Sequence, residues 1–522
     1  MPQLRDSGTR ALHATEPVPS AEMDGFCRIF GVETEYGVAV TGAEKPVDAG
    51  QVAMTMFQPI VSRSRSTNTY LTNGSRLYLD VGSHPEYATA EARDPREALA
   101  QDLAGEQVMR GLALKAQTKL RESYGAHATI HVFKNNVDSA GHAFGCHENY
   151  LVRRFVPLEA VEHQLLPFLI TRQLYTGAGR MTPDGFQITQ RADFLDEAVS
   201  SATTRSRPMV NTRDEPHADP DSFRRLHVII GDSNRSQWST WMKLAVTHLV
   251  LCVIEEAFRR GEPSGFEDWA FVDPAAANRA VSRFLDAPDA VLPLASGESV
   301  SALALQRRYF RAVESFVADH REAMDAAFAA GVPATGLSEK TVETTGEGLS
   351  GMTAGAGLAS DYSAGSLTTV ILGEWDRALR ALEQGDYDAL ADRVDWAAKR
   401  RVFEALRRRR PEVTFAQLEQ LELDYHDIAN GRLYGSLTAR SQMRRLLTAD
   451  ETERAIHEAP QDTRAALRGR FVEAALASGA QFSADWTHLT VTAPERREAV
   501  LLDPFEAAPT PEFSQLMESL GR

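Results

Sequence analysis

The hydrophobic patterns divide this 522-residue chain into a strand-rich first half and a mostly helical remainder. Patterns typical of strands occupy residues 28–41, 76–81, 127–135, 143–152 and 224–231, with shorter extended segments at 187–190 and 205–212. Strands and helices do not alternate as a parallel βαβ sheet requires. We therefore predict an α+β fold with a large, mainly antiparallel sheet.

Helical patterns and local composition predict the domain organisation. Helices are expected at 51–62, 95–124, 157–176, 235–260 and 463–477, followed by a strand at 482–492. A segment rich in Gly, Ser and Thr, 335–367, lacks periodicity and should be a mobile insertion. We expect a disordered tail at 1–27, a large domain at 28–445 and a small C-terminal domain at 446–522.

Composition excludes several classes of protein. With 56 Lys+Arg against 72 Asp+Glu the net charge is −16, so we expect no nucleic-acid partner. No run reaches the ~18 apolar residues of a membrane helix, and the N-terminus lacks the apolar core of a secretory signal. Three cysteines (Cys27, Cys146 and Cys252) are too few for a disulfide scaffold. These features favour a cytoplasmic protein without a membrane partner.

Charged side chains share one face on several predicted strands. Residues two apart in a strand lie on the same face, so Arg76, Tyr78 and Asp80 are aligned opposite two leucines. Glu33 and Glu35 are aligned in the same way on the first strand. The simplest interpretation is a face exposed to water, as one side of many antiparallel sheets is.

Two further segments repeat this pattern. Ser201, Thr203, Arg205 and Arg207 are aligned in one segment, and Arg225 and His227 in another. Four such segments together are harder to explain as solvated faces. They predict an open sheet face whose carboxylates hold Mg²⁺ and whose arginines bind the phosphates of a nucleoside triphosphate.

Other familiar site patterns are absent or incomplete in the sequence. No GxxxxGK[ST] motif occurs, and the two Gly-Ala-Gly segments do not complete a GxGxxG fingerprint. Cys146 and His147 are adjacent in a strand and should point to opposite faces, which disfavours a thiol nucleophile. His84 and Glu86 lack further ligands for zinc. The basic run 399–410 is typical of a solvated helix end, although it could also attract an acidic partner.

Five segments resemble the Pup ligase family, which attaches the prokaryotic ubiquitin-like protein Pup to lysines of target proteins. They are RIFGVETEYG (28–37), NGSRLYLDVGSHPEYATAE (73–91), FKNNVDSAGHAFGCHENY (133–150), SSATTRSRPMVNTRDEPHAD (200–219) and RRLHVIIGDSN (224–234). The resemblance covers about residues 28–503, with gaps. It implies a glutamine-synthetase-like large domain, with a curved antiparallel sheet cradling ATP, and a small C-terminal domain.

The resemblance also implies roles for individual residues. Asp80 matches the catalytic carboxylate of the family. Glu33, Tyr78 and Glu86 match its magnesium positions, and Arg76, Thr89 and Trp486 match its ATP contacts. Glu35, Arg205, Arg207 and His227 lie in family motifs and are assigned to metal or phosphate handling.

The implied function is an ATP- and Mg²⁺-dependent ligase. It joins the C-terminal glutamate side chain of Pup to a target lysine through a γ-glutamyl phosphate, which marks the target for proteasomal degradation. A closely related deamidase and depupylase of Pup has an extra loop before the strand at Arg76 and a variant of the DVGSHPEYATAE segment. Only a short segment separates Gly50 from Asn73 here, and this favours the ligase.

Three other functions stay open at this point: a depupylase, a non-catalytic relative that binds Pup, and a small-molecule glutamate–amine ligase. The chain also departs from the family in two places. GDSN is followed by RSQWST where the family usually has a small acidic run, and the 335–367 insertion is longer than expected. Both departures leave the catalytic motifs intact.

Overall fold

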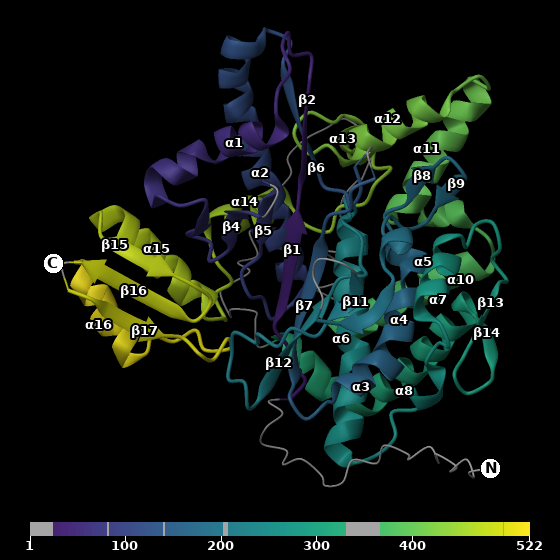
Figure 1. Ribbon diagram of the computed structural model, residues 1–522. Helices are drawn as coiled ribbons and strands as arrows, with labels where there is room; N and C mark the ends of the chain where they lie inside the picture. The colour runs from purple at the N-terminus through teal and green to yellow at the C-terminus, as the bar shows by residue number, and fades with distance from the viewer. Residues whose placement is uncertain are drawn as a thin grey trace, which may run out of the picture.

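An eight-stranded sheet forms the centre of the protein in the computed structural model, which describes residues 25–80, 83–138, 141–201, 207–329, 366–493 and 495–521 (Figure 1). In spatial order its strands are β10 (Glu197–Ser200), β11 (Pro208–Asn211), β12 (Phe223–Val228), β7 (Cys146–Arg153), β1 (Phe30–Glu35), β5 (Pro85–Ala88), β4 (Arg76–Leu79) and β3 (Asn68–Tyr70). All neighbours are antiparallel except β10 and β11. The predicted α+β class and mainly antiparallel sheet are confirmed.

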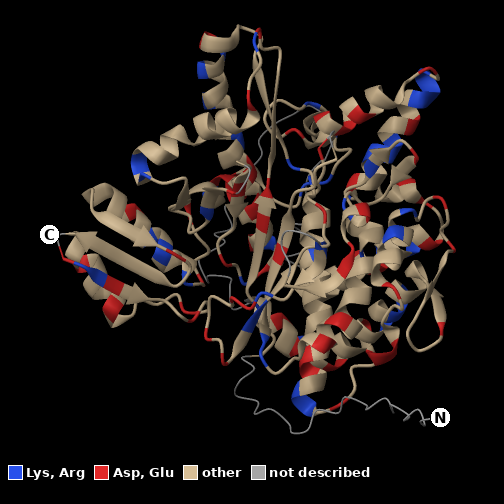
Figure 2. Cartoon of the chain, in the orientation of Figure 1, with Lys and Arg blue, Asp and Glu red and all other residues tan. Residues whose placement is uncertain are grey.

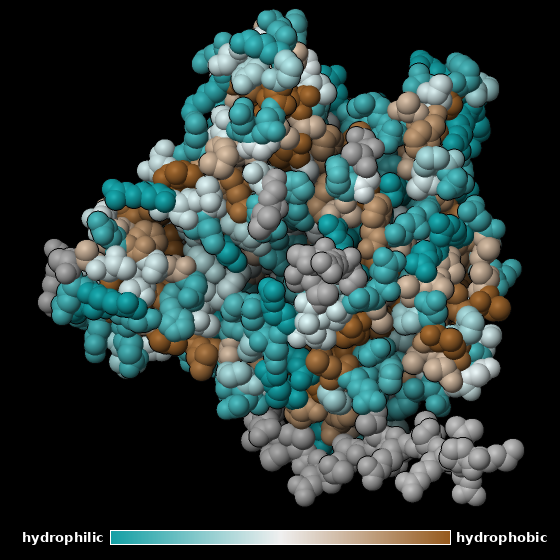
Figure 3. Space-filling model, viewed as in Figure 1, coloured by the Kyte–Doolittle hydropathy of each residue, from teal (hydrophilic) through white to brown (hydrophobic). Residues whose placement is uncertain are grey.

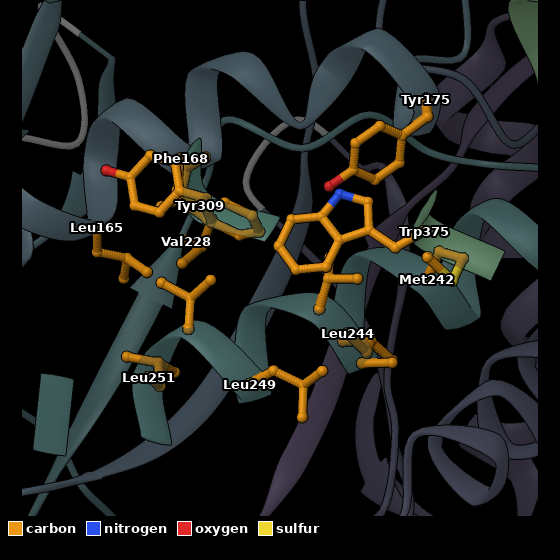
Figure 4. Close-up of a cluster of buried hydrophobic side chains, with 14 of the residues drawn as sticks. Leu165, Phe168, Tyr175, Val228, Met242, Leu244, Leu249, Leu251, Tyr309 and Trp375 are labelled. Carbon is orange, nitrogen blue, oxygen red and sulfur yellow. The ribbon is translucent and has the colours of Figure 1, made fainter. Parts of the chain in front are cut away.

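Helix α6 (Gln237–Arg260) lies at the heart of the main hydrophobic core. Every residue from Trp238 to Ala257 is buried, as expected for a helix enclosed on all sides. Figure 4 shows its side chains packed with those of β12 and of neighbouring helices, and labels Leu165, Phe168, Tyr175, Val228, Met242, Leu244, Leu249, Leu251, Tyr309 and Trp375. This core covers one face of the sheet and leaves the other face for a site.

The other helices of this large part pack around α6 or form smaller hydrophobic clusters beside it. They are α1 (Ala49–Ser64), α2 (Pro95–Tyr124), α3 (Leu158–Ala160), α4 (Leu166–Thr171), α5 (Gln173–Thr176), α7 (Pro274–Ser282), α8 (Ala302–Ala329), α10 (Leu367–Glu383), α11 (Asp395–Arg409), α12 (Phe415–His426), α13 (Leu433–Ala439) and α14 (Ala449–His457). Two short hairpins pair β8 (Arg180–Thr182) with β9 (Gly185–Gln187) and β13 (Val291–Pro293) with β14 (Ser299–Ser301). None of the helices in the described part of the chain has the length and hydrophobicity to span a bilayer.

Several predicted elements have different bounds in the structure. The strand predicted at 28–41 is two strands, because β2 (Gly37–Thr41) leaves the sheet and pairs only with β6 (Thr129–Phe133). The helix predicted at 157–176 is interrupted by a π-helical turn at Val161–Leu165. Pro167 lies directly after this turn and has no N–H to donate, which explains a break in the regular ladder. In contrast, α2 has the predicted bounds and begins at Asp94, whose carboxylate accepts from two backbone N–H groups.

The C-terminal residues form a smaller unit with its own core. It contains α15 (Ala465–Ser478), β15 (Gln481–Ala484), β16 (His488–Ala493), β17 (Arg497–Val500) and α16 (Pro511–Leu520), around the buried side chains of Leu467, Phe471, Leu489 and Phe513. The strand predicted at 482–492 is a hairpin, because the Asp485 side chain accepts from the N–H groups of Thr487 and His488 and closes a turn. The unit is yellow in Figure 1.

The predicted domain limits correspond only in part to described residues. Most of the tail predicted at 1–27 and of the insertion predicted at 335–367 lies outside them. Phe26 and Cys27 are buried against the main core, so these two residues of the predicted tail belong to the folded large part. Ser366 caps α10 by accepting from Thr369 N–H. The boundary at residue 446 stays a prediction.

Glu91 joins the C-terminal unit to the sheet. Its carboxylate follows β5 and accepts from Arg464 at 2.8 Å and from Arg468 on α15. All three side chains are buried. Burial alone would raise the pKa of Glu91, but the guanidinium groups of Arg468 and Arg464 lower it to about 2.

We predict that Glu91→Gln destabilises the protein at neutral pH by about 3 kcal/mol and that this effect fades in acid. A carboxyl whose pKa is lowered by folding stabilises the fold above its ordinary pKa of 4.5 and loses that contribution as the pH falls toward 2. Free energies of unfolding from denaturant titrations at pH 7, 4.5 and 3 measure this. Glu473→Gln, an exposed change on α15, is the control. A difference between wild type and Glu91→Gln that stays constant with pH would contradict the prediction.

Candidate active site

The open face of the sheet brings the predicted metal residues together. Along β1 the buried and half-buried residues alternate, with Phe30, Val32 and Thr34 in the core and Glu33 and Glu35 on the open face. Figure 2 shows acidic residues gathered on β1 and its neighbours at the centre of the molecule.

The strand register fixes which side chains are neighbours on this face. Glu33 lies opposite His147 on β7 and Ala88 on β5. Glu86 lies between Glu35 on β1 and Tyr78 on β4. Directly opposite residues in antiparallel strands have side chains on the same face. Three carboxylates and a phenol therefore meet on three adjacent strands.

A cavity of about 680 Å³ lies between this face and the C-terminal unit. Its walls include five of the residues predicted as site residues: Glu33, Arg76, Thr89, His227 and Trp486. It is lined by strands of the large part on one side and by the β15–β16 turn on the other. The volume lies within the range of cavities that hold small ligands, about 300–1,000 Å³.

Glu33 is the best-connected carboxylate in the cavity. Its Oε1 accepts from the Tyr78 hydroxyl at 2.6 Å. Its Oε2 lies 3.2 Å from His147 Nδ1 and 3.7 Å from His227 Nε2. Burial alone would raise the pKa of Glu33, but the hydrogen bond and charge of His147 together with His227 and Tyr78 lower it well below its usual range.

Glu86 is in the opposite electrostatic situation. It is buried, and burial together with the negative charges of Glu33, Glu35 and Asp80 raises its pKa well above the ordinary value. Burial and the negative charges of Glu33 and Glu86 raise the pKa of Tyr78, so its hydroxyl keeps its proton. A divalent cation between Glu33 and Glu86 would let both carboxylates ionise.

The donor set fits such a cation. Glu33, His147 and His227 each offer one ligand atom, and these atoms lie within 4.8 Å of one another. Both ring nitrogens of His227 are buried and have no hydrogen-bond partner among the described residues. Burial and the charge of His147 lower the pKa of His227 to about 3, so the ring is neutral, which is the form that binds metals.

The cavity has a carboxylate end at Glu33 and, opposite to it, an end formed by aromatic and basic side chains. Trp486 packs edge-on against Tyr70 at 5.2 Å, and the Arg468 guanidinium lies 4.9 Å from the centre of its indole ring. His217 lies 6.2 Å from the same ring. Aromatic faces of this kind suit a nucleotide base.

Arginines line the stretch between the aromatic and carboxylate ends. Arg76 on β4 donates to Asn68 at 2.9 Å and stacks over the Tyr78 ring at 4.1 Å. Arg213 and Arg225 lie 3.9 and 3.7 Å from Glu215, which is half exposed. Thr89 accepts from Val32 N–H, so its hydroxyl also holds β5 against β1. Cations at this position suit phosphate groups.

Asp80 lies just beyond the carboxylate end, outside the cavity walls. It is exposed and follows β4, and its N–H donates to the carbonyl of His84. The Glu35 carboxylate beside it lies 2.6 Å from His84 Nδ1 and accepts from Gly145 N–H at 2.7 Å. Burial alone would raise the pKa of Glu35, but these hydrogen bonds lower it. Arg76, Tyr78 and Asp80 thus follow one another along β4 and the residue after it, from the arginine-lined part of the cavity to the exposed Asp80.

Two arginines assigned from the sequence are not placed in this cavity. Arg205 lies outside the described residues. Arg207 is exposed and donates to the carbonyl of Ala143, so the structure does not bring it to the cavity walls. Residues 202–206 of the alternation predicted for 201–207 lie outside the described residues, whereas the alternation of Arg225 and His227 is present on β12.

Sequence reasoning missed several residues that the structure brings into the site. His147 was considered only as a partner for Cys146, and the two side chains do point to opposite faces, with Cys146 in the core. The same alternation continues to Asn149, which accepts from Arg225 at 3.3 Å. The strand predicted at 143–152 was the signal that could have identified both, because strand alternation places His147 and Asn149 on the face opposite Cys146. Arg213, Glu215 and His217 lie in a loop without periodicity, which gave no such signal.

Comparisons with known proteins agree with this geometry. A family model described as Pup-ligase protein matches residues 28–490. The Pup–protein ligase of Bifidobacterium longum (strain DJO10A) is 80% identical over 521 residues, which are 100% of both chains. A crystal structure of the complex between Pup and its ligase PafA matches with a TM-score of 0.80 and 35% identity, over 95% of this chain and 92% of that one. The structure of PafA in complex with ADP matches with a TM-score of 0.73 and 36% identity, over 91% and 94%.

Proposed function

The chain belongs to the Pup ligase family, and from this we propose that it is an ATP-dependent ligase that joins the C-terminal glutamate side chain of Pup to lysines of target proteins. The observation that carries the proposal is the order of side chains along the open face. Trp486, Arg76, Glu33 with Glu86, and Asp80 follow one another from the aromatic end of the cavity to an exposed acid. A nucleoside triphosphate laid along this line points its terminal phosphate toward solvent, where two proteins can meet.

The reaction must activate a carboxylate, which is a poor electrophile. The γ-phosphoryl group of ATP passes to the side-chain carboxylate of Pup's terminal glutamate, giving a γ-glutamyl phosphate and ADP. The lysine nitrogen then attacks the acyl carbon, the C–O bond to phosphate breaks, and an isopeptide bond and phosphate remain. Arg76 lies where it can stabilise the phosphoryl oxygens.

We assign the divalent cation to Glu33, Tyr78 and Glu86, with His147 and His227 as further donors. Mg²⁺ is the ion expected from the oxygen donors, and when bound it neutralises the charge of the triphosphate that would repel an incoming carboxylate. Glu33 accepts hydrogen bonds from both Tyr78 and His147, which orient it toward the cavity.

Asp80 is assigned as the proton acceptor. A carboxylate is a much weaker base than an amine, so it does not efficiently remove the proton of a resting ammonium. As the N–C bond forms, the nitrogen becomes acidic and a positioned carboxylate can take its proton. The exposed position of Asp80 beyond β4 leaves room for a lysine of a separate protein.

The proposal includes the cellular setting. All three cysteines are unpaired, which fits a reducing compartment, so we place the protein in the cytoplasm. There, conjugation to Pup would mark targets for proteasomal degradation, as the resemblance implies.

One assay separates this function from the alternatives. Purified protein is incubated with ATP, Mg²⁺, Pup and a lysine-bearing target, and products are identified by mass. A ligase yields the conjugate together with ADP, whereas a protein that only binds Pup yields neither. The same incubation started from purified conjugate detects a depupylase, and free glutamate with small amines detects a small-molecule ligase.

We predict that Asp80→Asn lowers the conjugation rate by about 10²-fold or more and leaves ATP affinity within about twofold, because the amide cannot accept the proton and lies outside the nucleotide cavity. Rates come from the conjugate formed over time, and affinity from calorimetric titration with ATP. Asp268→Asn, at an exposed acid outside the cavity, is the matched control. Conjugation by Asp80→Asn at the wild-type rate would show the assignment to be wrong.

We also predict that Glu33→Gln weakens Mn²⁺ binding by about tenfold or more, since it removes the charge that accepts from Tyr78 and faces both histidines. Mn²⁺ serves as a paramagnetic probe for Mg²⁺, and its binding is followed by electron paramagnetic resonance without nucleotide or turnover. Glu215→Gln removes a carboxylate from the same cavity but away from the two histidines, and should bind Mn²⁺ normally. Equal loss in both variants would mean that the cavity attracts cations only through its overall charge.

A further inference from the structure

A second cavity lies beside the nucleotide cavity, between the sheet and the C-terminal unit. Its volume is about 560 Å³, and it shares Asn68, Tyr70 and Ala484 with the first. Its remaining walls are the end of α1 and the segment after it, together with the end of α15 and strand β15. The function described above does not use this cavity.

Two strand edges with no neighbouring strand in the described part of the chain face this cavity, and on β3 Thr69 Oγ1 donates to the Tyr70 carbonyl at 3.4 Å. β3 is the last strand of the eight-stranded sheet, and β15 is an outer strand of the C-terminal sheet. Thr67 and Leu71 bond to β4 and its continuation through their main chains, so the main-chain groups of Asn68 and Tyr70 between them alternate to the opposite side. Ser66 Oγ accepts from Asn68 N–H at 3.0 Å, and no main-chain partner is found for Tyr70 N–H among the described residues.

The same alternation applies to β15. Asp485 N–H donates to His488 at 2.9 Å across the hairpin, so the main-chain groups of Phe482 and Ala484 alternate away from β16 and toward the cavity. Unpaired edges of this kind are templates on which an extended peptide can add as a strand. Two of them on one cavity are a stronger indication than either alone.

The rim of the cavity is positively charged within an acidic protein. Arg63 and Arg65 are exposed, and neither has a carboxylate within ion-pair distance among the described residues. Figure 2 shows the basic end of α1 beside the C-terminal unit, and Figure 3 shows hydrophilic residues next to hydrophobic ones over the same place. Because the chain carries a net charge of −16, an acidic peptide is repelled by most of the protein and attracted here.

The strand register relates the β3 edge to Asp80, the proposed proton acceptor. Tyr70 lies opposite Arg76 and Asn68 opposite Tyr78, so Ser66 continues the series toward Asp80. In a strand added outside β3, every second side chain would lie on the open face, in line with the cross-strand pairs Tyr70–Arg76 and Asn68–Tyr78. The added strand would lie two strand spacings from β4, about 10 Å, which the four-carbon stem of a lysine covers in large part.

We propose that the β3–β15 cavity receives an extended, acidic segment of the lysine-bearing target, which adds as a strand to the β3 edge and places carboxylates on Arg63 and Arg65. This inference rests on the proposed function, because it supplies the second protein substrate of the same reaction. Target choice then depends on a stretch of accessible extended chain with acidic residues near the lysine.

Three acceptors test the proposal in conjugation reactions with Pup, ATP and Mg²⁺. The first is the acetylated peptide amide Glu-Val-Lys-Val-Glu-Val. The second is the same peptide with both Val residues next to the lysine N-methylated, which removes strand hydrogen bonds. The third is Nα-acetyl-lysine methylamide. We expect the KM of the unmodified peptide to be at least about tenfold below that of either other acceptor.

The charge contribution is tested with the double variant Arg63→Glu, Arg65→Glu. It should raise the KM of the unmodified peptide by about tenfold and leave unchanged the KM of acetyl-lysine methylamide and of ATP. The matched control is Arg440→Glu, Arg445→Glu, at two exposed positions at and after the end of α13 and outside both cavities, which should behave as wild type.

Each outcome tests either the strand-addition inference or the proposed function. Equal KM values for all three acceptors would overturn this inference and leave the proposed function intact. If the arginine variant raised the KM of both peptides equally, the cavity would bind carboxylates without strand addition, which also overturns it. If no acceptor formed a conjugate while an intact protein target did, the extended-segment recognition would be wrong. Failure with every acceptor, protein targets included, would overturn the proposed function itself.

Discussion

The site depends on the register of β1 between β5 and β7. That register places Glu33 beside His147 and Glu35 beside Glu86, with all four side chains on the open face. A slip of one residue would turn the carboxylates into the hydrophobic core and expose Phe30 and its neighbours, at a cost no fold of marginal stability could sustain. The hydrophobic packing of the inner face therefore holds mutually repelling acids together on the outer one.

Buried ion pairs support the same strands from behind. Glu148, which lies between His147 and Asn149 on β7, points inward and binds Arg172 at 2.6 Å, with both side chains fully buried. Arg28, just before β1, binds Glu255 of α6 at 2.7 Å. Removing one partner of such a pair leaves an uncompensated buried charge, so these contacts fix the positions of β7 and β1 relative to the helical core. Site strands and core helices are thus fixed by polar contacts as well as by hydrophobic packing.

The sequence predicted what short-range periodicity can encode. The alternation of Arg76, Tyr78 and Asp80 and the helical pattern of 95–124 predicted a strand and a helix close to those observed. The prediction failed where the alternating pattern of a strand continued although the neighbouring strand changed. The chain leaves the large sheet directly after Tyr36 and continues as β2, which pairs with β6. Asp485 closes a turn that divides one predicted strand into the two strands of a hairpin. His217 and Arg213 could not be predicted from their loop, because their proximity to Trp486 comes from packing between segments more than 260 residues apart.

The nucleotide cavity exists only because two separately packed units meet. Trp486 belongs to the C-terminal core and Glu33 to the sheet, and the contact of Glu91 with Arg464 and Arg468 sets their relative position. A ligand that touches both walls binds only the joined state, so it stabilises that state by RT ln(1 + [L]/Kd). The same linkage works in reverse. The β3 and β15 edges belong to the same two units, so an acceptor strand bridging them would favour the arrangement that binds nucleotide, and the two substrates would assist each other's binding without touching.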